Sequence, residues 1–261
     1  MLPFETPVVI LAGGLGSRLG EITQRIPKPM VEVAGAPIML RIMDNYASYG
    51  FKNFVILAGY KSDMIRSFIG GLHLRDVNLT YSTLNGEAST TSVFPVGNTR
   101  DWMVTVLDSG VDTNTGGRLL HAKPFLEHHE NFFLTYGDAL TDVDFGEELS
   151  FHCRHSKIGT VLGVLQQSKF GKLELNGERV IEFSEKPKSA GNLISGGFFI
   201  FNHGIFDYLT SKDSVLEEHP LRELTNDKQL MCFQHGGFWQ CMDTPKEMTI
   251  MEEAIEAGHI K

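Results

Sequence analysis

Short apolar runs alternate with helical patterns along the first half of the chain. Residues 8–12 form an apolar run that ends in a glycine-rich turn, which predicts a buried parallel strand. From Pro37 to a stop at Gly50, apolar residues recur on one helical face. The same criteria predict further strands at 54–58, 79–82, 104–107 and 131–136, and helices at 61–69 and 117–122. This alternation predicts an α/β fold with a Rossmann-like, mostly parallel mixed sheet flanked by helices.

The second half of the chain has hairpin character. The run KLELNGERVIEF (172–183) places Asn176 and Gly177 between two alternating segments, which is a strong signal for a tight hairpin turn. Strands are also predicted at 159–165, 193–201 and 231–234, and a closing helix at 245–257. We therefore expect one domain over residues 1–261, with an antiparallel hairpin extension on the parallel sheet.

Residues 83–102 interrupt the alternation. The stretch is polar, contains two glycines and a proline, and shows no period. A structureless loop of about 20 residues is uncommon inside a compact domain. Two interpretations stay open, a tolerated surface insertion and a functional segment that acts as a lid or contacts another subunit.

The charge balance narrows the function classes. The chain of 261 residues carries 23 Lys and Arg against 32 Asp and Glu, a formal net charge of −9. This acidity argues against a sequence-independent nucleic-acid binder, and no apolar run approaches the roughly 20 residues that span a bilayer. The N-terminal segment lacks the basic start and long apolar core of a signal peptide. We therefore expect a cytoplasmic protein that binds neither nucleic acid nor a membrane.

The cysteines do not indicate a disulfide framework or a zinc site. Cys153, Cys232 and Cys241 are odd in number and form no CxxC motif. We expect them to be small, buried hydrophobic residues.

The clearest chemical motif is LAGGLGSRL at 11–19, followed by PKPM at 27–30. Glycines in a turn after a strand let backbone N–H groups approach phosphate oxygens, while Arg18 adds a planar fork and Lys28 a point charge. The motif is not a dinucleotide fingerprint, because Leu19 stands where the third glycine should be and Ala58 where a ribose-binding acid should end the second strand. No GK[ST] follows, which excludes a P-loop. A merely tight turn would explain one glycine, but not three beside Arg18 and Lys28.

Two aspartates follow apolar strands. Asp138 comes after FFLTY and Asp243 after GFWQCM, about a hundred residues later. The carboxyl ends of strands are where open α/β sheets bind ligands, and two carboxylates could hold one Mg²⁺ there. An aspartate after a strand is more often a turn-former or a helix N-cap, and we keep that interpretation for Asp142 and Asp144.

These motifs together resemble a known family. The pair LAGGLGSRL…PKPM is similar to the signature of sugar-1-phosphate nucleotidylyltransferases, and the chain resembles the glucose-1-phosphate cytidylyltransferases among them. The supporting blocks are TNTGGRL (113–119), FLTYGD (133–138), FSEKP (183–187), GGFF (196–199) and GFWQCMDT (237–244). The resemblance implies a nucleotide-diphospho-sugar transferase fold and the Mg²⁺-dependent reaction CTP + sugar 1-phosphate → CDP-sugar + pyrophosphate. It also implies a nucleotide-side half at about 1–140, a sugar-side half at about 141–261, and a homo-oligomer.

The resemblance assigns a role to each residue that matches the family motifs. The residues implied at the nucleotide are Leu11, Ala12, Gly13, Gly14, Leu15, Gly16, Ser17, Arg18, Lys28, Thr113, Arg118 and Gly137. Those implied at the sugar phosphate are Glu185, Lys186, Ser195, Gly196, Gly197 and Trp239. Asp138 and Asp243 would hold Mg²⁺, and the implied catalytic residues are Arg18, Lys28 and Asp138. Without the resemblance, Glu185 and Lys186 would be ordinary solvated charges and Trp239 a core residue.

No general base or covalent nucleophile is required for such a reaction. A sugar phosphate dianion is already a nucleophile, so catalysis reduces to alignment and stabilisation of charge. Arg18 and Lys28 are the groups expected at the departing pyrophosphate.

Three departures from the cytidylyltransferase pattern leave the substrates open. Ser195 stands where those proteins have Asn, Lys169 where they have Arg in GRFG, and Ala139 where they have a glycine. An Asn amide offers two donors and an acceptor, whereas a Ser hydroxyl is shorter and offers less. The identity of the sugar 1-phosphate and the choice between CTP and UTP therefore stay open. An alternative of another class also stays open, namely that the chain is a non-catalytic homologue that binds a sugar nucleotide.

Overall fold

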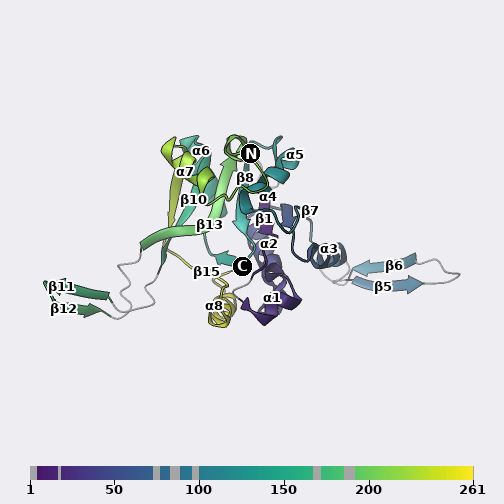
Figure 1. Cartoon of the computed structure of the whole chain (residues 1–261). Helices are drawn as coiled ribbons and strands as arrows, with labels where there is room; N and C mark the ends of the chain where they lie inside the picture. The colour runs from purple at the N-terminus through teal and green to yellow at the C-terminus, as the bar shows by residue number, and fades with distance from the viewer. Residues whose placement is uncertain are drawn as a thin grey trace.

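A seven-stranded sheet forms the centre of the molecule, with the strand order β14-β10-β13-β8-β1-β4-β7 (Figure 1). The computed structural model describes residues 5–16, 19–72, 77–82, 89–95, 100–166, 172–184 and 192–260. Strand β13 runs antiparallel to both of its neighbours, and the other strands of this sheet are parallel to one another. The prediction of a mostly parallel mixed sheet is therefore confirmed.

The strands of this sheet coincide closely with the predicted ones. Their bounds are β1 (Pro7–Ala12), β4 (Asn53–Ala58), β7 (Met103–Asp108), β8 (Asn131–Tyr136), β10 (Gly159–Gln166), β13 (Asn192–Asn202) and β14 (Leu230–His235). Four predicted helices are present as α2 (Ile38–Ser48), α3 (Ser62–Gly71), α4 (Thr115–His121) and α8 (Pro245–Glu256). Helices α1 (Glu21–Arg25), α5 (Lys123–Leu126), α6 (Phe145–His155) and α7 (His219–Asn226) were not predicted.

Helices cover both faces of the sheet because the central strands are apolar on both sides. In β1, Val8 and Ile10 face a core that includes residues of α2, α3, α6 and α8. Val9 and Leu11 face a second core with residues of α4, α5, α7 and the 3₁₀ helix η6 (His203–Tyr208). The continuous apolar run of β1 follows from this double burial, since a parallel strand covered on both faces has no solvent side.

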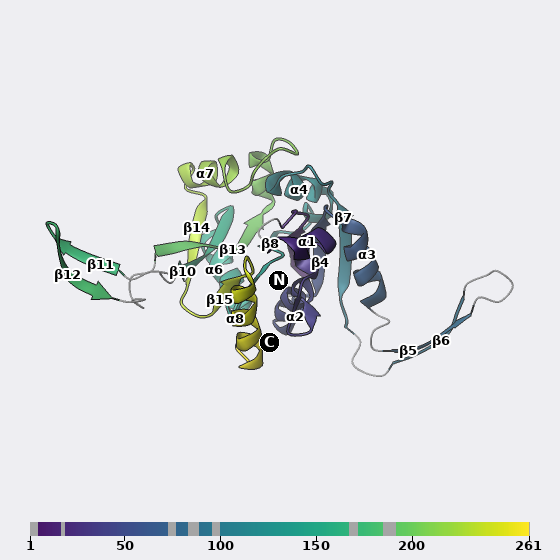
Figure 2. The same cartoon turned by 60° about the horizontal axis from the view of Figure 1, so that its bottom comes forward.

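Two hairpins stand apart from the central sheet and extend in opposite directions from the body (Figures 1 and 2). One pairs β5 (Val77–Ser82) with β6 (Ser89–Pro95), and the other pairs β11 (Lys172–Asn176) with β12 (Arg179–Ser184). The turn at Asn176 and Gly177 is confirmed, and Gly177 has a φ of +63°. The predicted antiparallel hairpin is therefore present, as a two-stranded sheet of its own beside the central sheet.

The prediction for residues 79–102 was partly wrong. The strand expected at 79–82 does not join the parallel sheet, because β7 occupies the position beside β4 and β5 pairs antiparallel with β6. Part of the stretch expected to lack structure is β6 itself, whose Thr, Val and Phe residues favour a strand. A local antiparallel pair needs only a short connection, whereas a parallel neighbour needs a crossover.

Helix α6 was missed because buried polar residues mask its apolar face. Glu148 and His152 are buried on it, although a polar residue normally marks the solvent side. The start of the helix carries a readable signal, since the carboxylate of Asp144 accepts a hydrogen bond from the backbone N–H of Glu147 at 2.9 Å. Asp144 is thus an N-cap, as its position after a strand suggested.

The cysteines are less buried than expected. Cys153 and Cys232 are exposed and Cys241 is half-buried, and all three thiols are free. Cys232 lies on β14, which is an edge strand, and Cys153 lies on the outer side of α6. No helix in the described part of the chain is both long and apolar enough to cross a membrane.

A buried carboxyl group lies between α2 and α6. Glu148 is fully buried, and within the described ranges neither its carboxylate oxygens nor the buried hydroxyl of Tyr46 has a hydrogen-bond partner. Burial raises the pKa of Glu148 to about 8. Burial, and then the nearby Glu148, raise the pKa of Tyr46 as well. Glu148 is therefore protonated in the folded protein at neutral pH.

This raised pKa predicts that stability falls as the pH rises. Below the unfolded-state pKa near 4.5 both states hold the proton, and between 4.5 and about 8 only the folded state holds it. Folding is then penalised by up to about 1.4 kcal/mol per pH unit across that window. We expect Glu148→Gln to remove this slope, so that its melting temperature relative to wild type rises from pH 5 to pH 8.5. The exposed neighbour Glu147→Gln is the control, and equal pH profiles for wild type and Glu148→Gln would contradict the prediction.

Candidate active site

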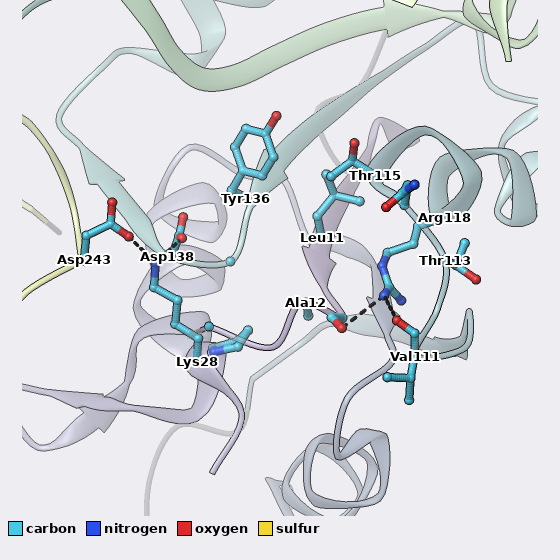
Figure 3. Close-up of a pocket in the computed structure, with 16 residues that line it drawn as sticks. Leu11, Ala12, Lys28, Val111, Thr113, Thr115, Arg118, Tyr136, Asp138 and Asp243 are labelled. Atoms are coloured by element: carbon cyan, nitrogen blue, oxygen red, sulfur yellow. Dashed lines mark hydrogen bonds and ion pairs between the residues drawn. The ribbon is translucent and has the colours of Figure 1, made fainter. Parts of the chain in front are cut away.

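A cavity of about 470 Å³ opens at the carboxyl ends of β1 and β8 (Figure 3). Its walls come from the glycine-rich turn after β1, the segment 111–118 that leads into α4, and residues 136–138 after β8. Lys28, Pro29 and Asp243 complete the lining. Open α/β sheets bind ligands at this edge, so the cavity lies where the sequence predicted a site.

The structure brings most of the predicted nucleotide and metal residues to this cavity. Those that line it are Leu11, Ala12, Gly13, Gly14, Gly16, Lys28, Thr113, Arg118, Gly137, Asp138 and Asp243. Leu15 is 58% exposed and does not line it. Ser17, Arg18, Lys169, Glu185 and Lys186 lie outside the described residues.

The carboxylates of Asp138 and Asp243 converge on the ammonium group of Lys28. The Lys28 Nζ lies 2.6 Å from Asp138 Oδ2 and 2.8 Å from Asp243 Oδ1 (Figure 3). Burial by itself would lower the pKa of Lys28, but Asp138 and then Asp243 outweigh it and raise that pKa. The lysine is therefore charged, and among the described residues this end of the cavity holds one positive and two negative groups.

Strand pairing places the two aspartates side by side. Asp138 follows β8, and the chain then forms β9 (Ala139–Thr141), which pairs antiparallel with β15 (Trp239–Cys241). The backbone N–H of Met242 donates to the carbonyl of Asp138 at 2.8 Å, so the next residue, Asp243, must lie beside Asp138. Lys28 begins the short helix η3 (Lys28–Met30) between Pro27 and Pro29, which restrict the backbone that presents it.

Arg118 organises the other end of the cavity from a buried position. Its guanidinium Nη atoms donate to the carbonyls of Gly13, Ala58, Gly110 and Val111 and to the hydroxyl of Ser109, at 2.6–3.2 Å. The residue is 4% exposed. These bonds join the glycine turn, the end of β4 and the loop after β7 around one cation. The Nη hydrogens are engaged by the protein, so Arg118 supports the turn rather than offering these donors to a ligand.

Arg118 also explains why Gly13 is a glycine. A Cβ atom at position 13 would lie 2.1 Å from Arg118 Nη1. The sequence alone suggested that this glycine makes room for phosphate, and the structure shows that it makes room for the guanidinium. The backbone of Gly13 is held further by the N–H of Tyr60, which donates to its carbonyl at 3.1 Å.

Glu217 fixes one wall of the cavity, and sequence reasoning missed it. Its Oε2 accepts from the Thr115 hydroxyl at 2.6 Å, and its Oε1 accepts from the Tyr136 hydroxyl. Burial, and then Glu217, raise the pKa of Tyr136. Thr115 and Tyr136 both line the cavity, so Glu217 joins α4 to the end of β8. Nothing in the polar sequence around residue 217 indicated this role.

The predicted sugar-side residues that the structure describes do not line the cavity, although Gly197 lies against it. The Trp239 indole N–H donates to the Gly196 carbonyl at 2.7 Å, and Ser195 Oγ accepts from the Gly197 N–H at 3.3 Å. Gly197 has a φ of +76°, and a Cβ there would lie 2.5 Å from the ring of the lining residue Tyr136. Trp239 is half-buried and packs against the core, so it has a structural role whether or not it contacts a sugar.

The donor set at Asp138 and Asp243 fits a hard divalent cation. Two carboxylate oxygens already converge on a single positive group, which shows that they can share one. Within the described residues, no three His, Cys, Asp or Glu side chains gather to enclose a metal ion. Mg²⁺ is commonly held by one or two carboxylates with phosphate oxygens and waters in the remaining positions, and this arrangement matches that pattern.

Comparisons with known proteins show the family and the fold. The model of the family described as Nucleotidyl transferase matches residues 7–244. A glucose-1-phosphate cytidylyltransferase of Salmonella typhimurium is 38% identical over 252 residues, which is 96% of each chain. A probable glucose-1-phosphate cytidylyltransferase of Bacillus subtilis is 38% identical over 251 residues, again 96% of each chain. The crystal structure of HddC from Yersinia pseudotuberculosis superposes with a TM-score of 0.69 at 22% identity, covering 96% of this chain and 99% of that one, which supports the fold.

The role of Arg118 predicts a loss of stability on its removal. Arg118→Met removes the five hydrogen bonds that the buried guanidinium donates, and we expect it to lower the free energy of unfolding by about 3 kcal/mol. Arg118→Lys keeps the charge but has only three N–H donors, and its loss should be intermediate. Denaturant unfolding measures both variants. A Met variant as stable as wild type would contradict the structural role.

Proposed function

This chain belongs to the nucleotidyl transferase family and is a sugar-1-phosphate nucleotidyltransferase, and from that premise we propose that it makes CDP-glucose from CTP and glucose 1-phosphate. The observation that carries the proposal is the convergence of Lys28, Asp138 and Asp243 at one end of a cavity bordered by a glycine-rich turn. The names of the two relatives that are 38% identical support the choice of cytosine and glucose. We propose that the whole chain acts as one catalytic domain.

The two ends of the cavity are lined by different groups, and each end binds a different part of the substrates. Lys28, Asp138 and Asp243 lie at one end, and Arg118, Val111 and Thr113 lie at the other (Figure 3). The reacting phosphates belong near Lys28, where a cation is available. The base belongs near Thr113 and Val111, where the lining holds a hydroxyl and backbone groups. Between them, the N–H groups of Gly13, Gly14 and Gly16 reach the triphosphate.

The reaction requires alignment rather than a protein nucleophile. A phosphate oxygen of glucose 1-phosphate attacks the α-phosphorus of CTP, the new P–O bond forms as the bond to the β-phosphate oxygen breaks, and pyrophosphate leaves. Lys28 neutralises charge that develops on the phosphates, and Arg18 is proposed for the same task at the leaving group. Asp138 and Asp243 would hold Mg²⁺, which supplies neutralisation of phosphate charge and alignment of the phosphate oxygens.

The sugar side of the proposal follows the motifs. Gly197 lies against the ring of Tyr136, which lines the cavity, and Trp239 holds the backbone of the neighbouring Gly196 through its indole N–H. Ser195, Gly197, Glu185 and Lys186 are proposed as the groups nearest the glucose phosphate. We propose a homo-oligomer on the strength of the resemblance alone.

Measuring pyrophosphate release over a panel of nucleotides and sugar 1-phosphates tests this function. With Mg²⁺ present, we expect kcat/KM to be highest for CTP with glucose 1-phosphate and at least about tenfold lower with UTP, because the two bases exchange a donor for an acceptor. Mass analysis of the product identifies the sugar nucleotide. A preference for UTP or another sugar would correct the substrate pair. Binding of CDP-glucose without turnover of any pair would instead indicate a non-catalytic homologue.

Removing the carboxylates tests the reaction centre. We expect Asp138→Asn and Asp243→Asn each to lower kcat by about 100-fold or more, since each weakens the hold on the cation that neutralises the phosphates. Asp142→Asn is the matched control, because Asp142 pairs with His235 at 2.7 Å and does not line the cavity. Full activity of the double variant at Asp138 and Asp243 would overturn the assignment.

A further inference from the structure

Lys28 occupies the space that a divalent cation would need. Its Nζ lies within 2.8 Å of one oxygen of Asp138 and one of Asp243. Mg²⁺ binds carboxylate oxygens at about 2.0–2.1 Å. A cation bound to the same two oxygens would therefore lie within a few ångströms of the lysine nitrogen, where contact and like charge both disfavour it. Lysine and metal cannot occupy this position together.

The positive charge of the lysine also offsets the repulsion between the two neighbouring carboxylates. The side chains of Asp138 and Asp243 are only 29% and 25% exposed, and that of Lys28 is 11% exposed. Two partly buried carboxylates side by side repel each other unless a cation separates them. In the substrate-free protein, Lys28 is a cation that does this.

The surroundings allow the ammonium to leave while its backbone stays fixed. The backbone of Lys28 lies between Pro27 and Pro29, and its Cβ packs close to Gly16 of the glycine turn. The flexible stem reaches into the cavity, which the glycine turn also lines. Among the described residues of the lining, the acidic ones are Asp138 and Asp243. A triphosphate held by the glycine turn brings phosphate oxygens within reach of the same stem, so a bound nucleotide gives the ammonium an alternative anionic partner.

We infer that Lys28 is a resident counter-ion of the metal position, and that a divalent cation displaces it onto the nucleotide phosphates. This inference rests on the proposed function. Without nucleotide, the metal must expel an ammonium that finds no third carboxylate among the described residues of the cavity lining. With nucleotide, the same displacement gives the ammonium a phosphate partner, so metal and nucleotide bind with positive coupling. Lys28 then reaches the reacting phosphates only when the metal is in place.

Binding of Mn²⁺ to the nucleotide-free protein tests the inference directly. Electron paramagnetic resonance of free Mn²⁺ measures the affinity for wild type, Lys28→Met and Lys28→Gln. We expect both variants to bind Mn²⁺ at least about tenfold more tightly than wild type, because the competing cation is gone. The gain should disappear when Asp138→Asn is added to Lys28→Met, which localises it to this site.

Controls separate the local effect from a change in total charge. Lys52→Met removes a lysine that lies 3.9 Å from the exposed Asp101 and does not line the cavity, and this variant should bind Mn²⁺ as wild type does. The melting temperature gives a second readout: the Lys28 variants should melt below wild type without metal and gain more than wild type on addition of Mg²⁺. Lys28→Gln provides the test if Lys28→Met does not fold.

The outcomes distinguish this inference from the proposed function. Equal Mn²⁺ affinity of wild type and both folded Lys28 variants would overturn the displacement of Lys28. Formation of CDP-glucose by the wild-type protein in the same preparation tests the reaction separately. Normal product formation with no gain in Mn²⁺ affinity would refute the inference alone, whereas the expected gain without any product would refute the proposed reaction while leaving a metal site.

Discussion

The contact of one ammonium with two carboxylates is the constraint on which the candidate site depends. In the sequence, Lys28 is 110 residues from Asp138 and 215 residues from Asp243. In the structure, its Nζ lies within 2.8 Å of a carboxylate oxygen of each. Three separate features make that meeting possible: the prolines around Lys28, the end of β8, and the pairing of β9 with β15. Each of these would have little purpose alone. Together they produce a small charged centre that can exchange one cation for another.

Arg118 is a second cation of the cavity, and its hydrogen-bond partners differ in kind from those of Lys28. Lys28 meets carboxylates and can change partners, whereas Arg118 is enclosed by carbonyl groups that cannot leave. One end of the cavity is therefore adaptable and the other is rigid. The described lining holds two cations, Lys28 and Arg118, and two carboxylates, so binding of an anionic substrate depends on local donors and a bound cation rather than on the net charge of −9.

Sequence reasoning recovered those features that depend on local pattern. Burial produces a regular pattern of apolar residues in three of these elements, which is why the sequence predicted them. They are the apolar run of β1, the helical face of α2 and the strand before Asp138. The hairpin β5–β6 was missed since its strands pair with each other, and α6 because buried Glu148 and His152 disguise its inner face. At the site, the motifs identified Lys28, Asp138 and Asp243 but not their mutual contact. Hydrogen bonds of the buried Arg118 and of Glu217 join residues that are distant in sequence, so the spacing of motifs along the chain does not predict them.

Anomalous diffraction from Mn²⁺ tests the central claim most directly. Crystals grown with Mn²⁺ and a non-hydrolysable CTP analogue would show the metal and Lys28 in one experiment. The account predicts an anomalous peak between the carboxylates of Asp138 and Asp243, with Lys28 Nζ beyond hydrogen-bonding distance of both and in contact with phosphate oxygens. A peak elsewhere, or a lysine that still bridges the two aspartates beside a bound nucleotide, would contradict it.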